Sequence, residues 1–385
     1  MRKHWILIVC MLIAFGCTGK SGEEAAPADF LKEVPQDAAF VLEIPSHLDA
    51  KFESESVTVS IDAAVTAAQT TQFQIDRITY EPLSVERYLE ILNVVAPDVQ
   101  WRTAEGETVS SEQAVRSVIV YLNTDDDQFL YLNTPANQLC WFRRANGVLM
   151  PESGCEEPED YAMFADAAFP DPDAAREQAI RTIEQAGFGS EFSVASEERG
   201  IVLKQEEPTE SGWIFRFARQ SGQLPGISIV GYTIWRNTGY PKLCGPWKQE
   251  TIQVFVTEDG TTNFSYANIG TFQQTVFRDV KLLPFDTIIK NMADRLILQH
   301  ERTNDGYGPF KTEAHVVSMQ LCNALVAEAR GKTGYTIPAW EIRYDLIDLD
   351  AYGQETDRFT EALYLSALTG EAIEPRCIHE DEGNK

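Results

Sequence analysis

The sequence predicts an α+β fold made of antiparallel sheets, each covered by a helix. Two observations lead to this prediction. Many short segments alternate apolar with polar residues, which is the period of a strand with one face buried. Three other segments have their apolar residues at helical spacing, and strand-like segments follow each of them. With 385 residues, 44% of them apolar, the chain can bury the cores of two domains.

Each predicted helix has a recognisable start or end. Ser84 is a good N-cap for the first helix, and Pro97 ends it. Asp171 caps the second helix, which ends at Gly187, and Pro284 begins the third. The helices are expected over 84–96, 172–186 and 285–299. Because strands follow each helix, a repeated α-β-β-β unit is one interpretation. The other is that helices simply cover antiparallel sheets, as is common in α+β folds.

The strands are predicted from alternation and from the turn residues between them. Val57, Val59 and Ile61 alternate with polar residues in the first strand. The dipeptide Asn146-Gly147 predicts a hairpin between two later strands, because it favours a two-residue turn. The predicted strands are, in order, 57–65, 73–80, 116–123, 128–133, 138–144, 147–150, 192–197, 200–205, 213–219, 252–256, 272–282, 314–328, 336–346 and 360–368.

A change in composition predicts the domain boundary. Residues 151–172 are acidic and rich in proline, with no clean periodicity, so we place the boundary there. The predicted units are a signal peptide at 1–16, a tether at 17–35, an N-terminal α+β domain at 36–158, a C-terminal α+β domain at 159–376 and an acidic tail at 377–385.

The amino-terminal segment predicts export. Two basic residues precede an apolar run over 5–15, which is too short to span about 30 Å of hydrocarbon but suits a secretory signal. The next residues, Gly16-Cys17, resemble the lipobox of bacterial lipoproteins, in which the cysteine is acylated before cleavage. This resemblance implies an extracytoplasmic protein anchored by lipid at Cys17. Ala14 stands where the box usually has Leu, and the alternative is an ordinary signal peptide.

The charge balance excludes two kinds of partner. The chain has 32 Lys and Arg against 59 Asp and Glu, a formal net charge of -27. Binding to nucleic acid requires massed basic residues, and so does adsorption to anionic lipid. We therefore expect no nucleic-acid partner, and contact with a membrane only through the lipid anchor.

The cysteines suit an oxidising compartment only in part. Five remain after removal of the signal peptide and use of the lipidated cysteine, which is an odd number. Cys140 and Cys155 flank the predicted hairpin, so we favour a disulfide between them. Cys322 and Cys377 form a weaker second pair, which leaves Cys244 over. The alternative is five free thiols.

No catalytic motif stands out. No His pair or Cys cluster has zinc spacing, and neither a nucleophile elbow nor a phosphate-binding loop occurs, so we predict no metal, no cofactor and no catalysis. Asp348, Asp350 and Gly353 match three positions of a calcium-binding loop. Tyr352 and Phe359 occupy two further ligand positions, however, so the match is poor.

Aromatic residues are dense at 213–247. Trp213, Phe215 and Phe217 alternate, and they are expected to face the core of a sheet. Others lie in irregular chain, where they serve either as anchors for a partner or as the small core of a long loop. These candidate binding residues are Tyr232, Trp235, Tyr240 and Trp247.

Two stretches carry a further resemblance. The segment 239–285, from Gly239-Tyr240-Pro241 through Pro246-Trp247, resembles uncharacterised lipoproteins of clostridial-type bacteria that have a domain of unknown function. The motif Ile337-Pro338-Ala339-Trp340-Glu341, followed by the Thr369-Gly370 turn, is similar to the closing hairpin of PepSY-like domains. The resemblance covers about 239–373, and it implies an envelope protein that binds or restrains something without catalysis.

These features together predict a lipid-anchored protein of the cell envelope that binds or regulates another envelope protein. Thr18 rather than Asp after the lipidated cysteine indicates the outer membrane, if the host has two membranes. One alternative is an extracytoplasmic hydrolase of glycan or peptide that uses carboxylates. Another is a lipoprotein that binds a solute in a pocket lined by the aromatic residues above.

Overall fold

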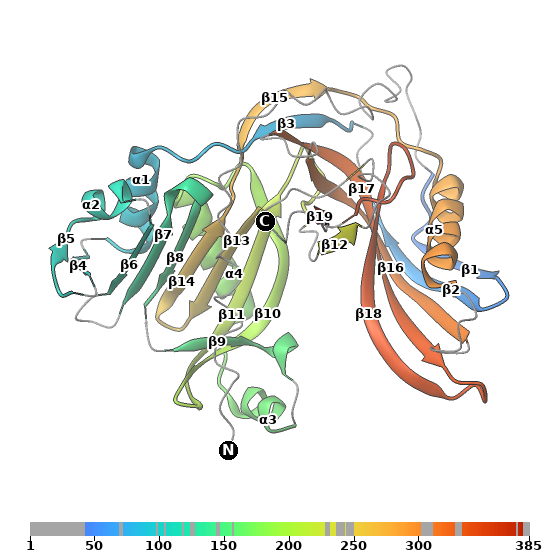
Figure 1. Ribbon diagram of the computed structural model, residues 1–385, viewed down its shortest axis with the longest axis horizontal. Helices are drawn as coiled ribbons and strands as arrows, with labels where there is room; N and C mark the ends of the chain where they lie inside the picture. The colour runs from blue at the N-terminus through green and yellow to red at the C-terminus, as the bar shows by residue number, and fades with distance from the viewer. Residues whose placement is uncertain are drawn as a thin grey trace.

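The protein has two lobes, each built around one sheet (Figure 1). Strands make up 51% of the structure and helices 22%. The predicted mixed α+β class is therefore confirmed, with strands dominant. The computed structural model describes residues 43–68, 72–97, 99–103, 105–117, 119–123, 128–143, 147–155, 158–227, 232–235, 243, 250–301, 311–327, 333–374 and 376–379.

The seven-stranded sheet joins strands from early and late parts of the chain. Its order is β1-β2-β16-β17-β3-β15, and β18 also pairs with β17. β2 runs parallel to β16, whereas β3 is antiparallel to β17. The strands are β1 (His47–Glu53), β2 (Val57–Thr66), β3 (Ile75–Thr79), β15 (Thr271–Phe277), β16 (Lys311–Ala327), β17 (Thr333–Leu349) and β18 (Glu355–Ser366).

The ten-stranded sheet takes the middle of the chain. Its order is β5-β4-β6-β7-β8-β14-β13-β11-β10-β9, and its neighbouring strands are antiparallel. Its strands are β4 (Trp101–Arg102), β5 (Thr108–Val109), β6 (Ile119–Asn123), β7 (Phe129–Asn133), β8 (Gln138–Phe142), β9 (Val148–Pro151), β10 (Phe192–Lys204), β11 (Glu207–Arg219), β13 (Thr251–Thr257) and β14 (Gly260–Ala267). A separate parallel pair joins β12 (Tyr232–Trp235) to β19 (Arg376–His379).

The three predicted helices are confirmed, and two begin with the predicted caps. Ser84 Oγ accepts a hydrogen bond from Arg87 N at 3.2 Å, and an Asp171 carboxylate oxygen accepts one from Ala174 N at 2.9 Å. Two shorter helices were not predicted. The helices are α1 (Val85–Val95), α2 (Ser111–Arg116), α3 (Pro158–Asp166), α4 (Pro172–Gln185) and α5 (Phe285–His300), with 3-10 turns η2 (Thr134–Ala136) and η3 (Glu152–Gly154). Within the described ranges, no helix combines the length and the apolar character needed to cross a membrane.

Each lobe has its own apolar core. In the seven-stranded lobe α5 packs against β2 and β18, burying Met292 and Leu296. In the other lobe α4 packs against β10, β11, β13 and β14, burying Ile183. Phe215 and Phe217 point into this second core, as their alternation predicts. The two sheets have different strand orders, and they do not confirm the repeated α-β-β-β unit. That unit stays a prediction.

The two sheets divide the chain differently from the predicted domains. The ten-stranded sheet spans 101–267, so the predicted boundary at 158 falls inside it, between the paired strands β9 and β10. The seven-stranded sheet combines strands from 47–79 with strands from 271–366. Composition along the chain does not report such pairing, because the pairing joins segments that are distant in sequence.

The acidic segment expected to separate two domains is folded onto the ten-stranded sheet. Trp213 Nε1 on β11 donates a hydrogen bond to Pro170 O at 3.0 Å. The guanidinium of Arg199 on β10 lies 5.9 Å from the ring centroid of Phe164 and 5.2 Å from that of Phe169. These contacts make residues 158–171 part of the ten-stranded lobe rather than a linker.

The predicted hairpin at Asn146-Gly147 is wrong. β8 pairs with β7 and β14, whereas β9 pairs with β10 at the far edge of the same sheet. Leu139 and Trp141 of β8 are buried in the core. Burial of these side chains between β7 and β14 outweighs the local preference of a dipeptide for a tight turn. Residues 144–146, which include Asn146 of the predicted turn, lie outside the described part of the chain.

Candidate functional site

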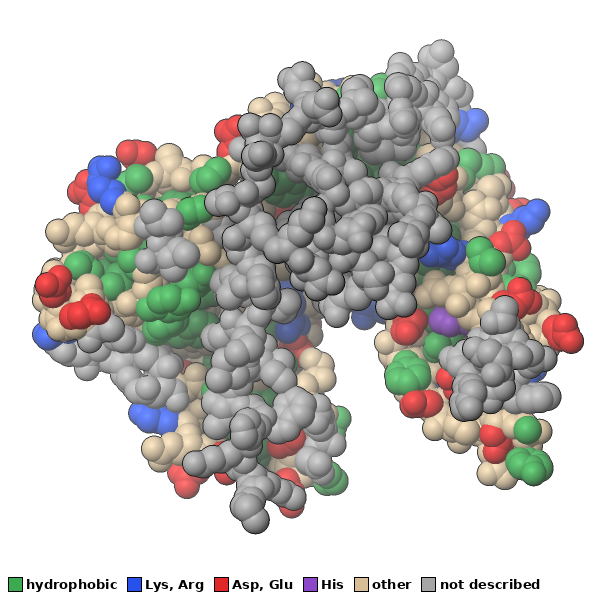
Figure 2. All heavy atoms as spheres, in the orientation of Figure 1, with side chains coloured by type: hydrophobic (Ala, Val, Ile, Leu, Met, Phe, Trp, Pro, Cys, Tyr) green, Lys and Arg blue, Asp and Glu red, His purple; other side chains and the backbone are tan. Residues whose placement is uncertain are grey.

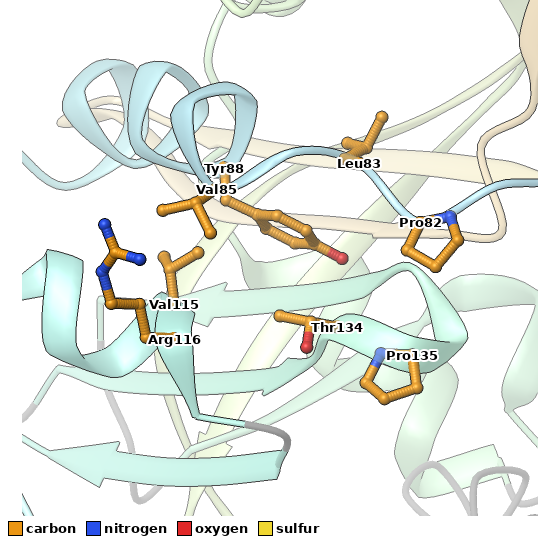
Figure 3. Close-up of a pocket in the computed structure, with 8 residues that line it drawn as sticks. All are labelled: Pro82, Leu83, Val85, Tyr88, Val115, Arg116, Thr134 and Pro135. Atoms are coloured by element: carbon orange, nitrogen blue, oxygen red, sulfur yellow. The ribbon is translucent and has the colours of Figure 1, made fainter.

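A shallow pocket opens where α1, α2 and η2 meet at one end of the ten-stranded lobe (Figure 3). Its volume is about 530 Å³. Tyr88 and Val115 are buried beneath it, and half-buried apolar side chains form its walls. Its lining residues are Pro82, Leu83, Val85, Tyr88, Val115, Arg116, Thr134 and Pro135.

The local sequence explains why two helices begin or end beside this pocket. Ser84 caps the amino end of α1, which carries Val85 and Tyr88 toward the pocket. Ser110 and Gln113 form a reciprocal capping box at the start of α2, with bonds of 3.2 Å and 2.8 Å. The six residues of α2 are thereby fixed, and they present Val115 and Arg116 to the pocket.

Asn137 holds three separate segments together behind the pocket. Its Oδ1 accepts hydrogen bonds from Tyr88 Oη at 3.2 Å and from Leu83 N at 3.4 Å. Its Nδ2 donates to Ile269 O at 2.5 Å. Asn137 has φ 51°, a left-handed conformation that Asn tolerates better than most residues. The shape of the pocket floor therefore depends on one buried amide.

The chemistry of the lining residues suits binding rather than catalysis. Burial raises the pKa of Tyr88 to about 12, so the phenol stays protonated at neutral pH. Arg116 Nη2 donates to Glu112 Oε1 at 2.8 Å, and its side chain is 61% exposed at the rim. The lining therefore offers apolar surface, one threonine hydroxyl and one exposed cation. None of these groups is a nucleophile or a general base at neutral pH.

The structure describes only part of the predicted binding and lipidation set. Cys17, Tyr240 and Trp247 lie outside the described residues. Tyr232 and Trp235 are the first and last residues of β12, which pairs with β19, and their side chains are not among those described. The predicted use of these aromatic residues as anchors therefore stays a prediction.

The predicted disulfide between Cys140 and Cys155 is absent, because Cys155 is a free thiol. Cys140 lies on β8, whereas Cys155 follows η3 beyond β9, and four strands separate β8 from β9 in the sheet. At about 4.8 Å per strand step, the two strands are about 24 Å apart, far beyond the roughly 7 Å that a disulfide can bridge. The disulfide was predicted from the hairpin at Asn146-Gly147, so it failed together with that hairpin.

The predicted pair of Cys322 and Cys377 is absent as well, because Cys322 is free. Cys322 is fully buried on β16, and its Sγ donates a hydrogen bond to Ala339 O at 3.3 Å. Burial raises the pKa of this thiol well above its usual value. The residue is a packed core group, so it is poorly suited to disulfide exchange.

The acidic segment with partial resemblance to a calcium loop is the turn between β17 and β18. Asp350 Oδ1 accepts hydrogen bonds from Tyr352 N and Gln354 N, both at 2.8 Å. Asp348 Oδ1 accepts one from Thr312 Oγ1 at 3.0 Å, and Gly353 adopts φ 75°. These bonds make a conventional Asx-type turn. Among the residues that the structure describes, no three His, Cys, Asp or Glu side chains are grouped to hold a metal ion.

The sequence patterns did not single out the pocket. Its lining comes from three segments, 82–88, 115–116 and 134–135. The cap at Ser84 was visible in the sequence, but Asn137 carried no recognisable signal. A pocket of this kind forms only when strands β6, β7 and β8 set the helices and η2 side by side.

The comparisons with known proteins bear on the fold alone. No family model matches the chain, and no curated protein matches it. Among solved structures, it is similar to an uncharacterized protein from Eubacterium rectale ATCC 33656, at 13% identity and a TM-score of 0.52. The similarity covers 86% of this chain and 94% of that chain. The two proteins therefore share an overall arrangement that extends over both lobes.

Proposed function

We propose that this protein acts by binding and not by catalysis, as a lipid-anchored component of the cell envelope. The observation that carries the proposal is the pocket between α1, α2 and η2. Its apolar floor and walls can receive an apolar group, and its one exposed cation can face an acidic neighbour of that group. A protonated phenol and an arginine provide no acid–base pair for turnover.

The proposed ligand is an apolar side chain presented by another envelope protein. A volume of about 530 Å³ admits one or two large side chains but is open on one side, so a protruding chain segment fits better than an enclosed solute. Arg116 at the rim favours a partner segment that carries a carboxylate beside the inserted group.

The location rests on the amino-terminal sequence. The basic start, the short apolar run and Gly16-Cys17 support export and acylation of Cys17, and Thr18 supports the outer membrane in a host with two membranes. The resemblance of 239–373 to lipoproteins of unknown function and to PepSY-like domains supports the same role. The proposed architecture has a helix covering each sheet and is built from repeated α-β-β-β units.

Crosslinking in intact cells tests the binding role. A photoreactive residue at Pro135, on the exposed rim, is compared with one at Tyr352, an exposed turn residue of the other lobe. A discrete adduct at position 135 and none at 352 is expected. Val85→Trp, which fills the pocket, should remove the adduct, whereas Ile180→Trp, at an exposed position of α4, should retain it. Equal adducts at both positions, or insensitivity to Val85→Trp, would contradict the proposal.

Lipidation is tested separately. Metabolic labelling with an alkyne fatty acid should label the chain, and Cys17→Ser should remove both the label and recovery in the membrane fraction. An unlabelled wild-type chain contradicts the envelope location but leaves the pocket test standing.

A further inference from the structure

The face of the ten-stranded sheet turned away from its helices carries a row of aromatic rings. Leu122, Leu130 and Leu139, on β6, β7 and β8, point into the core beneath α1 and α4. Because side chains alternate along a strand, their neighbours point to the opposite face. The residues on that face with described side chains are Tyr121, Phe129, Tyr131, Asn133, Gln138, Cys140 and Phe142.

The rings form one continuous cluster across three strands. Tyr121 lies opposite Tyr131 in the strand register, and their ring centroids are 4.9 Å apart. The ring centroids of Tyr121 and Phe129 are 6.3 Å apart. Phe129 lies opposite Phe142, with centroids 6.1 Å apart. Tyr121 is 60% exposed, Phe129 and Phe142 are half-buried, and Tyr131 is buried beside them at 4% exposed. Hydrophobic side chains gather over this part of the lobe in the space-filling view (Figure 2).

Amide groups flank the rings. Asn133 Nδ2 donates a hydrogen bond to Tyr131 Oη at 3.1 Å, which orients that phenol. Gln138 lies opposite Asn133 in the next strand, but its Oε1 is buried and is therefore not open to a ligand. Asn133 is half-buried at this face, so its amide can pair with a ligand that brings hydroxyl groups.

The part of this face that lies over β6, β7 and β8 carries no charge among its described side chains. None of the residues named above for this face is ionised at neutral pH, in a chain that has 32 basic and 59 acidic residues. An acidic or basic partner would find no complementary group there. The face therefore matches a neutral ligand that combines apolar C–H surface with hydroxyl groups.

We propose that this aromatic face binds a neutral polysaccharide chain. One face of a pyranose ring presents C–H bonds whose partial positive charge packs against the negative face of an aromatic ring. Its hydroxyls can pair with the half-buried amide of Asn133 and with the exposed Tyr121. Successive sugar units would lie across β6, β7 and β8, at about 4.8 Å per strand. This site is on the opposite side of the sheet from α1, and it does not depend on the pocket proposed above.

Affinity electrophoresis tests the proposal on the full chain in a detergent without sugar. The probes are gels cast with mixed-linkage β-glucan, xyloglucan or galactomannan, each compared with a gel that lacks polysaccharide. At least one of these is expected to slow migration of the protein. Tyr121→Ala should weaken that binding by about tenfold or more, because exposed aromatic anchors dominate such contacts. Tyr121→Trp, which keeps a stacking ring, should retain it.

Tyr352→Ala is the matched control, since Tyr352 is 89% exposed in the other lobe. It should migrate as the wild type does. Circular dichroism should show that both alanine variants are folded, as expected for exposed positions. The proposal is overturned if none of the three polysaccharides retards the protein. It is equally overturned if Tyr121→Ala binds as the wild type does, or if Tyr352→Ala causes the same loss.

Discussion

Arg219 and Glu250 face each other as a forked ion pair that is almost excluded from water. Arg219 Nε lies 2.8 Å from Glu250 Oε2, and Arg219 Nη2 lies 2.6 Å from Oε1. The same carboxylate accepts from Gly270 N at 2.7 Å, and the guanidinium donates to Gly270 O at 2.5 Å. Gly270 directly precedes β15, so the pair at the end of β11 ties the ten-stranded sheet to the first residue leading into the other sheet.

Removing one partner of this pair should strongly destabilise the fold. Glu250→Ala leaves the Arg219 guanidinium buried with only the more exposed Glu191 as counter-charge. We expect a loss of about 3–5 kcal/mol in the free energy of unfolding, measured by urea denaturation. Glu177→Ala, in an exposed i,i+4 pair on α4, is the control and should change it by less than about 1 kcal/mol. An equal loss in the free energy of unfolding for Glu250→Ala and Glu177→Ala would show that the buried ion pair does not stabilise the contact between the lobes.

Asn137 should matter through its side chain rather than its backbone. Asn137→Gly preserves the left-handed conformation but leaves Tyr88 Oη, Leu83 N and Ile269 O without their partner. We expect a loss of about 2–3 kcal/mol by chemical denaturation. Gln205→Gly is the matched control, because Gln205 is exposed and has φ 55°. It should be neutral or slightly stabilising. An unchanged free energy of unfolding in Asn137→Gly would contradict the stabilising role of the Asn137 side chain beneath the pocket.

Strong alkali should weaken the protein through its buried tyrosines. Burial raises the pKa of Tyr88 to about 12, against about 10 for a tyrosine in an unfolded chain. The folded state therefore holds this proton more tightly. Its contribution of about 2–3 kcal/mol is complete below pH 10 and is lost as the pH rises to 12. Burial also raises the pKa of Tyr80 and Tyr266, which adds to the loss in the same direction.

Urea denaturation from pH 8 to 12 measures this effect. Tyr88→Phe should flatten the decline in the free energy of unfolding above pH 10, and Tyr352→Phe, at an exposed tyrosine, is its control. A decline as steep in Tyr88→Phe as in the wild type would assign the alkaline loss to other groups.

Cys322 should resist alkylation until the protein unfolds. Complete burial raises its pKa and excludes reagent, so at pH 8 its reaction with iodoacetamide should be at least about tenfold slower than in guanidinium chloride. Peptide mapping without reduction should find no link between Cys140 and Cys155. Finding that link would contradict the strand order of the ten-stranded sheet.

Local sequence signals predicted the elements that depend only on neighbouring residues. Helix starts at Ser84 and Asp171 were visible because a capping side chain bonds to backbone three residues away. The core-facing residues Phe215 and Phe217 were visible because a strand alternates its faces. The mixed α+β class follows from such patterns.

Contacts between distant segments were decided only by the tertiary structure. β2 pairs with β16, and β9 pairs with β10 rather than with β8, because each strand finds the partner that buries most apolar surface across the whole sheet. The candidate site has the same origin, since Tyr88 and Asn137 meet from segments that are 49 residues apart. The net charge of -27 and the helix caps were determined by the sequence itself. The pocket, the aromatic face and the unpaired Cys155 and Cys322 depended on strand order, which no local pattern encodes.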